Sequence, residues 1–183
     1  VDLEALVRDA SADARVADPS RTITVRIAAP LVVDGDAMRL HQVLANLLRN
    51  ALVHTPASTP VEVVLRGDAG YAHIDVIDHG RGIPESQREL VFQRFHRADP
   101  ARSGDQGGSG LGLSIAAAVV SAHAGSISVR TTPGGGATFS VALPLRSGRD
   151  APADAPTTAG DTADPLARPA SRPSAPRGTL QQE

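Results

Sequence analysis

The sequence predicts an α/β sandwich, in which an open mixed sheet is covered by helices on one face. Segments with apolar residues at helical spacing alternate along the chain with segments in which β-branched and apolar residues alternate with polar ones. Clusters of Gly and Pro separate these segments. Two pairs of strand-like segments are joined by short glycine-containing connections, which favour neighbouring strands.

The first third of the chain predicts a helix, a strand and a longer helix. A short amphipathic helix is expected at the N-terminus, with apolar positions at Leu3, Leu6 and Val7. Residues 22–27 read as a strand. Asp36 is a candidate N-cap for the longer helix, which Pro56 and Pro60 end. The apolar positions of that helix are Leu40, Val43, Leu44, Leu47, Leu48 and Ala51.

Two strands follow, at 61–66 and 71–77, joined around the turn residues 67–70. A long polar stretch then runs from 84 to 108. It is longer than most connections in a compact domain, so a lid over a binding site is a better explanation than an ordinary loop.

The last ordered elements are a helix and a hairpin. The helix is expected over 111–122, with Gly125 just past its end as a terminator. Two strands, 127–129 and 139–143, flank the turn sequence Pro133-Gly134-Gly135-Gly136.

Length and composition limit the function classes. The chain has 183 residues, enough for one domain, and its formal net charge of -2 gives no reason to expect a nucleic-acid partner. It has no cysteine, which excludes disulfides and thiolate zinc sites. No apolar run approaches the roughly 20 residues of a membrane-spanning helix. Because the first residue is Val1 rather than Met, we expect a fragment of a longer protein.

The composition changes near Arg146. Residues 147–183 are rich in Pro, Ala, Ser, Thr and Asp, and their only large apolar residues are Leu166 and Leu180. Such a segment cannot bury enough apolar surface to offset chain entropy. We therefore expect one domain over 1–146 and a disordered tail over 147–183.

A polar stripe runs along the long helix, opposite its apolar stripe. Its members are Arg39, Gln42, Asn46, Arg49, Asn50 and His54. A solvated face is the ordinary explanation, but two Asn residues inside a helix argue mildly against it, because Asn is a modest helix former. An Asn oxygen is a neutral, hard ligand that suits Mg²⁺ already carrying phosphates and waters. Both interpretations remain open on these residues alone.

A first glycine box, Asp78-His79-Gly80-Arg81-Gly82-Ile83-Pro84, follows a predicted strand. A fixed carboxylate at Asp78 would accept from the exocyclic amine of adenine and reject guanine's carbonyl. Gly80 and Gly82 would let the backbone approach a flat base, and Ile83 would pack on the ring. The alternative is a simple Gly-rich turn.

A second glycine box, Gly108-Ser109-Gly110-Leu111-Gly112-Leu113, opens the last predicted helix. Backbone N–H groups at a helix start favour anions, and glycine lets a phosphate come close. No Gly-Lys-Ser/Thr follows, so this is not a Walker loop. The spacing also differs from the dinucleotide fingerprint.

Between the boxes, residues 91–97 look like a short helix anchored by Phe92 and Phe95, which are equally suited to be core residues. Three arginines of this stretch are candidates to meet phosphates, and we expect no more than one of them to do so. They are Arg94, Arg97 and Arg102.

Together, these segments resemble the catalytic, ATP-binding domain of bacterial sensor histidine kinases, in the superfamily that also holds gyrase B, Hsp90 and MutL proteins. Residues 40–51 look like the family's asparagine box, 78–84 its first glycine box, 91–99 its phenylalanine box and 107–113 its second glycine box. Four motifs in the right order make the resemblance specific. It covers about residues 1–145 and implies the Bergerat ATP-binding fold, a five-stranded mixed sheet with three helices on one face and a flexible ATP lid.

The resemblance implies roles for individual residues. Asn50 would be the Mg²⁺ ligand, Asp78 the adenine reader, and Arg94 and His54 phosphate-side contacts. The positions expected to form the ATP site are Asn46, Asn50, His54, Asp78, Gly80, Gly82, Ile83, Arg94, Gly108, Gly110, Leu111 and Gly112. One position departs from the pattern: family members often carry Lys or Arg where this chain has Val53, which would weaken ATP binding unless another arginine compensates.

Two absences bear on the reaction. The superfamily's hydrolases and anti-sigma serine kinases carry a Glu where this chain has Asn46, so efficient hydrolysis is disfavoured. No histidine is followed directly by Asp or Glu, as a phosphoacceptor would be. The six histidines are His41, His54, His73, His79, His96 and His123.

We therefore expect a protein histidine kinase catalytic domain that binds Mg·ATP and donates the γ-phosphate to a histidine on a separate hairpin. That dimerisation and phosphotransfer domain would lie upstream of Val1 or on another chain, with a response regulator as an indirect partner in two-component signalling. The fragment itself would be a monomer and the cytoplasmic part of a membrane-bound sensor. The alternatives are a stand-alone ATPase or serine kinase, and a non-catalytic nucleotide-binding pseudokinase.

Overall fold

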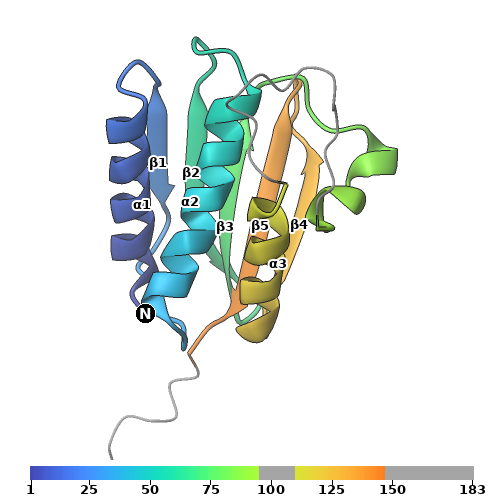
Figure 1. Ribbon diagram of the computed structural model, residues 1–183. Coiled ribbons are helices and arrows are strands. Elements are labelled where there is room, and N and C mark those ends of the chain that lie inside the picture. The colour runs from blue at the N-terminus through green and yellow to red at the C-terminus, as the bar shows by residue number, and fades with distance from the viewer. Residues whose placement is uncertain (95–109, 147–183) are drawn as a thin grey trace, which may run out of the picture. The chain divides into compact units, whose positions relative to one another are not determined.

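Three helices lie on one face of a five-stranded mixed sheet (Figure 1). The computed structural model describes residues 1–94 and 110–146. This arrangement confirms the predicted two-layer α/β fold. The predicted disordered tail, 147–183, and most of the second half of the polar stretch lie outside the described residues.

The helices begin where the sequence supplies caps. α1 (Leu3–Ala17) is capped by Asp2, whose carboxylate accepts from the N–H groups of Glu4 and Ala5. At 15 residues it is longer than the short helix predicted. α2 (Ala37–His54) begins after Asp36, which accepts from Met38 N and Arg39 N, so the predicted N-cap is confirmed.

The strands are arranged in the order β1-β2-β3-β5-β4. β1 (Ile23–Ile27) runs parallel to β2 (Val61–Asp68), with α2 in the connection. β2 is antiparallel to β3 (Tyr71–Asp78), and β3 is antiparallel to β5 (Ala137–Pro144). β4 (Ser126–Thr131) pairs with β5 across the predicted hairpin and forms one edge of the sheet.

The core lies between the helices and the sheet. Alternate strand residues face the helices, and Phe139 of β5 is its largest fully buried side chain. The pairing register places Ile23, Val61 and Asp78 side by side across three strands. Asp78 therefore lies on the helix-covered face at the carboxyl end of β3, where it is 6% exposed.

The polar stretch after β3 differs in part from the prediction. It forms two single turns of 3₁₀-helix, η1 (Glu85–Gln87) and η2 (Leu90–Phe92). The helix predicted from residue 91 ends at Phe92, because Gln93 is extended and no side chain caps the turn. Phe92 packs edge to face on Phe139, with ring centroids 6.3 Å apart, so it is a packing anchor. Phe95, Arg97 and Arg102 lie outside the described residues.

The end of α3 (Gly112–Ala122) corrects another expectation. Ala124, not Gly125, adopts the left-handed backbone conformation, with φ of 54°. Gly125 is needed for a different reason: a Cβ there would collide with the carbonyl of Ala142 and the side chain of Leu143. This glycine lets the chain pass close to β5 as it enters β4.

None of the helices in the described part of the chain is long and apolar enough to cross a membrane.

Candidate functional site

Asp78 is held rigidly at the end of β3. Its Oδ1 accepts hydrogen bonds from the backbone N–H groups of Gly80, at 2.9 Å, and Ala137, at 3.2 Å. Within residues 1–94 and 110–146, no hydrogen bond engages its second oxygen, Oδ2. One oxygen therefore fixes the orientation of the carboxylate, and the other is left to accept from a ligand.

The first glycine box needs its glycines for space. A Cβ at Gly80 would lie 2.7 Å from Thr55 Cγ2, which makes Thr55 the wall against which the box packs. Gly82 has φ of 72°, and a Cβ there would lie 2.7 Å from the carbonyl oxygen of Gly136. Ile83 follows, half-buried against the hydrophobic core.

The β4–β5 hairpin supports Asp78 from the other side, which the sequence did not reveal. Gly136 has φ of 106°, and a Cβ there would collide with the Asp78 carbonyl. Ala137, next in the chain, donates to the Asp78 carboxylate. The run of three glycines predicts a turn and by itself says nothing of this support. Its length, beyond what a hairpin needs, was the available sign of a close backbone contact.

The two asparagines of α2 differ in their surroundings. Asn46 donates from Nδ2 to the Gly112 carbonyl oxygen at 3.1 Å, which ties α2 to the start of α3. Asn50 lies one turn further along α2 and is half-buried. No hydrogen bond of its side chain occurs among the described residues. Its amide oxygen is thus available in the part of the chain that the structure describes.

The start of α3 lacks a side-chain cap. Leu111 occupies the N-cap position with helical backbone angles, and no side chain of the described residues accepts from the first N–H groups. Gly110 precedes it with φ of 68°. A Cβ at Gly112 would meet only Asn46, at ordinary contact distances of 3.5 Å or more. Packing of the described residues therefore gives no reason for glycine at 112, whereas close approach of an anion to the helix start would.

His54, the last residue of α2, lies near the first glycine box. Partial burial of its ring lowers the pKa of His54 below the usual 6.5. The positive charge of Arg81 lowers this pKa further, and the negative charge of Asp78 opposes both effects. Arg81 and Asp78 therefore both act electrostatically on His54, and its role as a phosphate-side contact stays a prediction.

Three other positions singled out in the sequence contribute little to the described geometry of the site. Arg94 is exposed at the end of the first described stretch. Gly108 lies outside the described residues. Val53 is 44% exposed on α2, so its side chain does not contribute to the core. The described residues contain no cluster of three or more His, Asp or Glu side chains that could hold a metal ion on their own.

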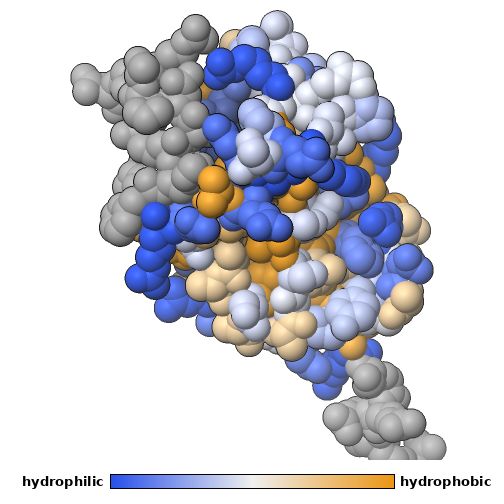
Figure 2. Space-filling view, turned by 90° about the vertical axis from the view of Figure 1, so that its right-hand side faces the viewer, coloured by the Kyte–Doolittle hydropathy of each residue, from blue (hydrophilic) through white to orange (hydrophobic). Residues whose placement is uncertain are grey.

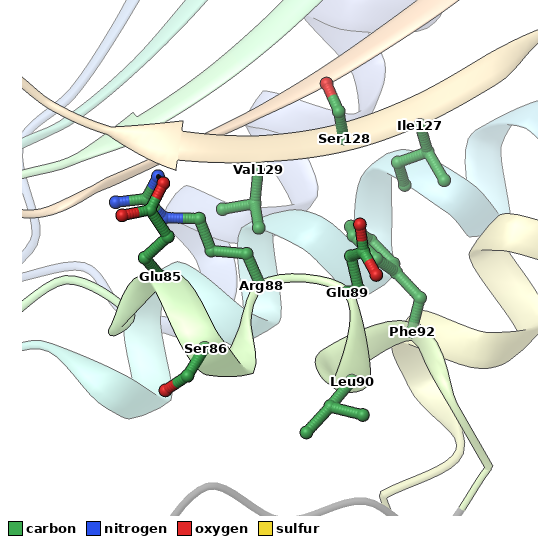
Figure 3. A pocket seen from close by; sticks show the side chains of 9 residues that line it. All are labelled: Glu85, Ser86, Arg88, Glu89, Leu90, Phe92, Ile127, Ser128 and Val129. Atoms are coloured by element: carbon green, nitrogen blue, oxygen red, sulfur yellow. Dashed lines mark ion pairs between the residues drawn. The ribbon is translucent and has the colours of Figure 1, made fainter.

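A groove of about 560 Å³ lies away from these residues, between the two 3₁₀ turns and the edge strand β4 (Figure 3). Arg88 closes one end of it, donating to Thr131 Oγ1 at 2.7 Å and to the Ile83 carbonyl at 3.4 Å. None of the predicted nucleotide-site residues lines the groove. Its lining is Glu85, Ser86, Arg88, Glu89, Leu90, Phe92, Ile127, Ser128 and Val129. Figure 2 shows this side of the molecule, where apolar surface appears among hydrophilic side chains.

Known proteins are similar to this chain in sequence and in fold. Residues 35–147 match the family described as histidine kinase-, DNA gyrase B- and HSP90-like ATPase. The probable sensor histidine kinase TcrY of Mycobacterium tuberculosis is 46% identical over 146 residues, which are 79% of this chain and 30% of TcrY. The sensor-like histidine kinase SenX3 of Mycobacterium bovis is 42% identical, covering 79% of this chain and 36% of SenX3.

The solved structure of the mycobacterial sensor histidine kinase MprB superposes with a TM-score of 0.70 at 32% identity, covering 80% of this chain and 96% of that one. Of the curated relatives TcrY and SenX3, by contrast, the chain spans only about a third of the length. The family match covers more than half of its 183 residues, and the fold agrees with it. The chain belongs to the histidine kinase-, DNA gyrase B- and HSP90-like ATPase family, and its counterparts are the catalytic domains of sensor histidine kinases.

Proposed function

We propose that this chain binds Mg·ATP and transfers its γ-phosphate to a histidine on a separate phosphoacceptor hairpin. In that step a bond forms between an imidazole nitrogen and the γ-phosphorus, the bond from that phosphorus to the β,γ-bridging oxygen breaks, and ADP leaves. The observation that carries the proposal is the Asp78 carboxylate, buried and fixed by two backbone N–H groups through one oxygen only.

Asp78 would select adenine. Its free Oδ2 is an acceptor held by the end of β3 and by the hairpin, so it cannot turn away to suit a different base. An acceptor pairs with the exocyclic amine of adenine, whereas the carbonyl of guanine would face it without a proton to share. Gly80, Gly82 and Ile83 would form the adjoining surface.

Asn50 and the start of α3 would hold the phosphates. The uncapped N–H groups at Gly112 favour negative charge, and Asn46 holds that helix start against α2. The amide oxygen of Asn50 fits Mg²⁺ that takes its remaining ligands from phosphates and water, because the described residues offer no carboxylate cluster. When bound, Mg²⁺ would neutralise charge on the transferring phosphoryl group.

The side chain at position 46 favours transfer over hydrolysis. Asn46 uses its amide N–H to bind the Gly112 carbonyl, and an amide is too weak a base to activate water. A stand-alone ATPase would need a carboxylate near the γ-phosphate to take that proton. The stand-alone ATPase or serine kinase and the pseudokinase remain the alternatives.

Three of the described histidines are engaged by other groups of the chain. His41 pairs with Asp13 at 3.4 Å, and His79 with Glu62 at 3.1 Å. His123 accepts from Asp36 N–H at 3.0 Å and contacts the Val119 carbonyl at 2.8 Å. These engagements support a phosphoacceptor outside this stretch of chain, on a dimerisation and histidine phosphotransfer domain upstream or on another protein.

Calorimetry of Mg·ATP binding tests the nucleotide site. Asp78→Asn would replace the free acceptor with an amide and lower the affinity at least tenfold, and Asn50→Ala would lower the dependence of binding on Mg²⁺. Asp68→Asn, the same change at an exposed strand end, is the matched control. Wild-type affinity in both site variants would overturn the residue assignments.

Transfer from γ-labelled ATP to a supplied phosphoacceptor hairpin tests the reaction. Acid-labile phosphohistidine on the hairpin is the expected product. Acid-stable phosphoserine, or release of inorganic phosphate without the hairpin, would favour the alternative enzymes. Mg·ATP binding with no transfer would favour the pseudokinase.

The remaining parts of the proposal concern the whole protein. The domain would span 1–146, followed by a disordered tail at 147–183, and this fragment would be a monomer in the cytoplasmic part of a membrane-bound sensor. A response regulator would receive the phosphate from the hairpin. Sedimentation at several concentrations tests the monomer, and proton NMR line widths test the tail.

A further inference from the structure

The guanidinium of Arg21 is buried close to the candidate site and belongs to none of the four sequence motifs. Arg21 lies in the turn between α1 and β1, and its side chain is 2% exposed. Its Nη1 donates to Thr55 Oγ1 at 2.7 Å and to the carbonyl oxygens of Pro56 and Thr59 at 2.6 and 2.9 Å. Its Nη2 donates to the carbonyls of Leu52 and Thr55 at 2.9 and 3.2 Å.

These acceptors are the end of α2 and the loop after it. The last carbonyls of a helix have no partner within the helix, and they carry the negative end of its dipole. Arg21 supplies a positive charge and planar donors to Leu52 and Thr55 at this end. A buried charge is tolerated only when its donors are satisfied, so the guanidinium fixes where this loop lies.

Thr55 connects Arg21 to the first glycine box through direct contacts. Its hydroxyl donates to the Ala51 carbonyl at 2.7 Å and accepts from Arg21, which holds the side chain in one rotamer. Its methyl group Cγ2 is the atom that a Cβ at Gly80 would meet at 2.7 Å. Gly80 in turn donates its N–H to Asp78 Oδ1. A continuous path of contacts therefore runs from Arg21 through Thr55 and Gly80 to the adenine-reading carboxylate.

We propose that Arg21 is a positioning residue for base recognition, which acts through Thr55 to hold Gly80 and Asp78 in the geometry that selects adenine. The inference rests on the proposed function, because it needs a nucleotide in the site. It goes beyond that function by assigning base selectivity to a residue that does not touch the base. Small displacements of a positioned group have large effects on recognition, so loss of Arg21 would weaken selectivity as well as stability.

The variants separate positioning from folding. Arg21→Met removes all donors at similar length, and Arg21→Lys keeps the charge with fewer, differently placed donors. Thr55→Val keeps the methyl group against Gly80 and removes only the hydroxyl that Arg21 binds, so it tests the path even if Arg21→Met does not fold. The matched control is Arg15→Met: Arg15 also donates to a backbone carbonyl, that of Ile23 at 2.7 Å, whereas Arg21 is the arginine that binds Thr55.

Calorimetry with Mg·ATP and Mg·GTP on the full chain, at a temperature where each variant is folded by circular dichroism, gives the readout. Arg21→Met and Thr55→Val are expected to lose about tenfold in ATP affinity and to lower the ATP-to-GTP affinity ratio. Arg21→Lys is expected to restore part of both. Arg15→Met is expected to stay within about twofold of wild type in both quantities.

Two results would contradict two different claims: the inference about Arg21 and the proposed function. If wild type binds Mg·ATP and both Arg21→Met and Thr55→Val keep its affinity and its ATP-to-GTP ratio, Arg21 serves only the fold and the inference is wrong. If Arg21→Met does not fold, Thr55→Val alone decides by the same criterion. If wild type binds no Mg·ATP, the proposed function fails first and the inference fails with it.

Discussion

At the scale of single residues, the fold requires glycine at Gly82 and Gly136, whereas packing of the described residues does not require it at Gly112. Gly136 and Gly82 have left-handed backbone angles and no room for a Cβ. Gly112 has neither constraint, although it begins α3 beside Asn46. Glycine within a helix is less favourable than alanine, so a ligand that must approach the backbone is a physical reason for glycine at this first helical position.

The pair Gly112→Ala and Gly136→Ala tests this division. Gly112→Ala is expected to leave the free energy of unfolding unchanged or raise it by up to about 1 kcal/mol, while lowering ATP affinity. Gly136→Ala is expected to destabilise the fold by several kcal/mol, because the Cβ collides with the Asp78 carbonyl. Urea denaturation and calorimetry measure the two quantities. Wild-type ATP affinity in Gly112→Ala would contradict a phosphate contact at this position.

His54 gives a prediction about pH. Because its pKa is lowered in the folded protein, the unfolded chain binds a proton more readily. Stability from this group is therefore complete above about pH 6.5 and is lost as the pH falls through the folded-state pKa. His54→Gln is expected to flatten the rise of unfolding free energy between about pH 5 and 7, and Arg81→Gln to flatten it in part. An unchanged slope in both variants would contradict the shift.

Sequence patterns at this scale single out Asp78 and the glycines as candidates but not Thr55 and Arg21. A carboxylate after a strand and closely spaced glycines are local signals, readable from neighbours in the chain. Arg21 and Thr55 are 34 residues apart and meet only once α2 has returned the chain to the turn between α1 and β1. No periodicity in the sequence marks an arginine that will be buried. Arginine is mostly exposed in folded proteins, so the residue type itself predicts exposure.

At the scale of elements, α2 is capped at its start by the adjacent Asp36 and held at its end by the distant Arg21, which donates to the Leu52 and Thr55 carbonyls. Its N-cap was predictable, because Asp36 stands at the break before the apolar stripe. The bond from Asp36 N–H to His123, at the end of α3, was not. The C-terminal turn carries one basic residue, His54, whose lowered pKa favours the neutral form. Val53 is exposed on the same turn.

Val53→Lys is therefore expected to act in two ways. A cation in the last turn of α2 interacts favourably with the helix dipole, by a few tenths of a kcal/mol at an exposed position. It also supplies the basic residue that the family resemblance leads us to expect at this position, so Mg·ATP affinity would rise several-fold and become more sensitive to salt. Val16→Lys, at a residue 79% exposed on α1, is the matched control for added charge. Equal effects of the two variants on ATP affinity would contradict a local role for position 53.

At the scale of the whole molecule, the sequence predicted the layers but not the order of the strands. Periodicity identifies each strand, and short turns identify the neighbours β2 with β3 and β4 with β5. The pairing of β3 with β5 joins segments separated by the polar stretch and α3, and no local signal encodes it. That pairing is what brings Ala137 to Asp78, so the best-supported contact of the site depends on the least predictable part of the fold.

Because Asp78 holds β3, the glycine box and the hairpin together, ligand binding there should stabilise the whole sheet. A ligand that binds only the folded state raises the unfolding free energy by RT ln(1 + [L]/Kd), which is about 2.7 kcal/mol at 100 times Kd. Mg·ATP is therefore expected to raise the melting temperature of wild type by several degrees, and by much less in Asp78→Asn at the same concentration. Asp68→Asn, whose carboxylate lies at the exposed end of β2, should respond as wild type does. A full Mg·ATP-dependent shift in Asp78→Asn would place the nucleotide elsewhere, and the groove along β4 would then be the next surface to test by Phe92→Ala.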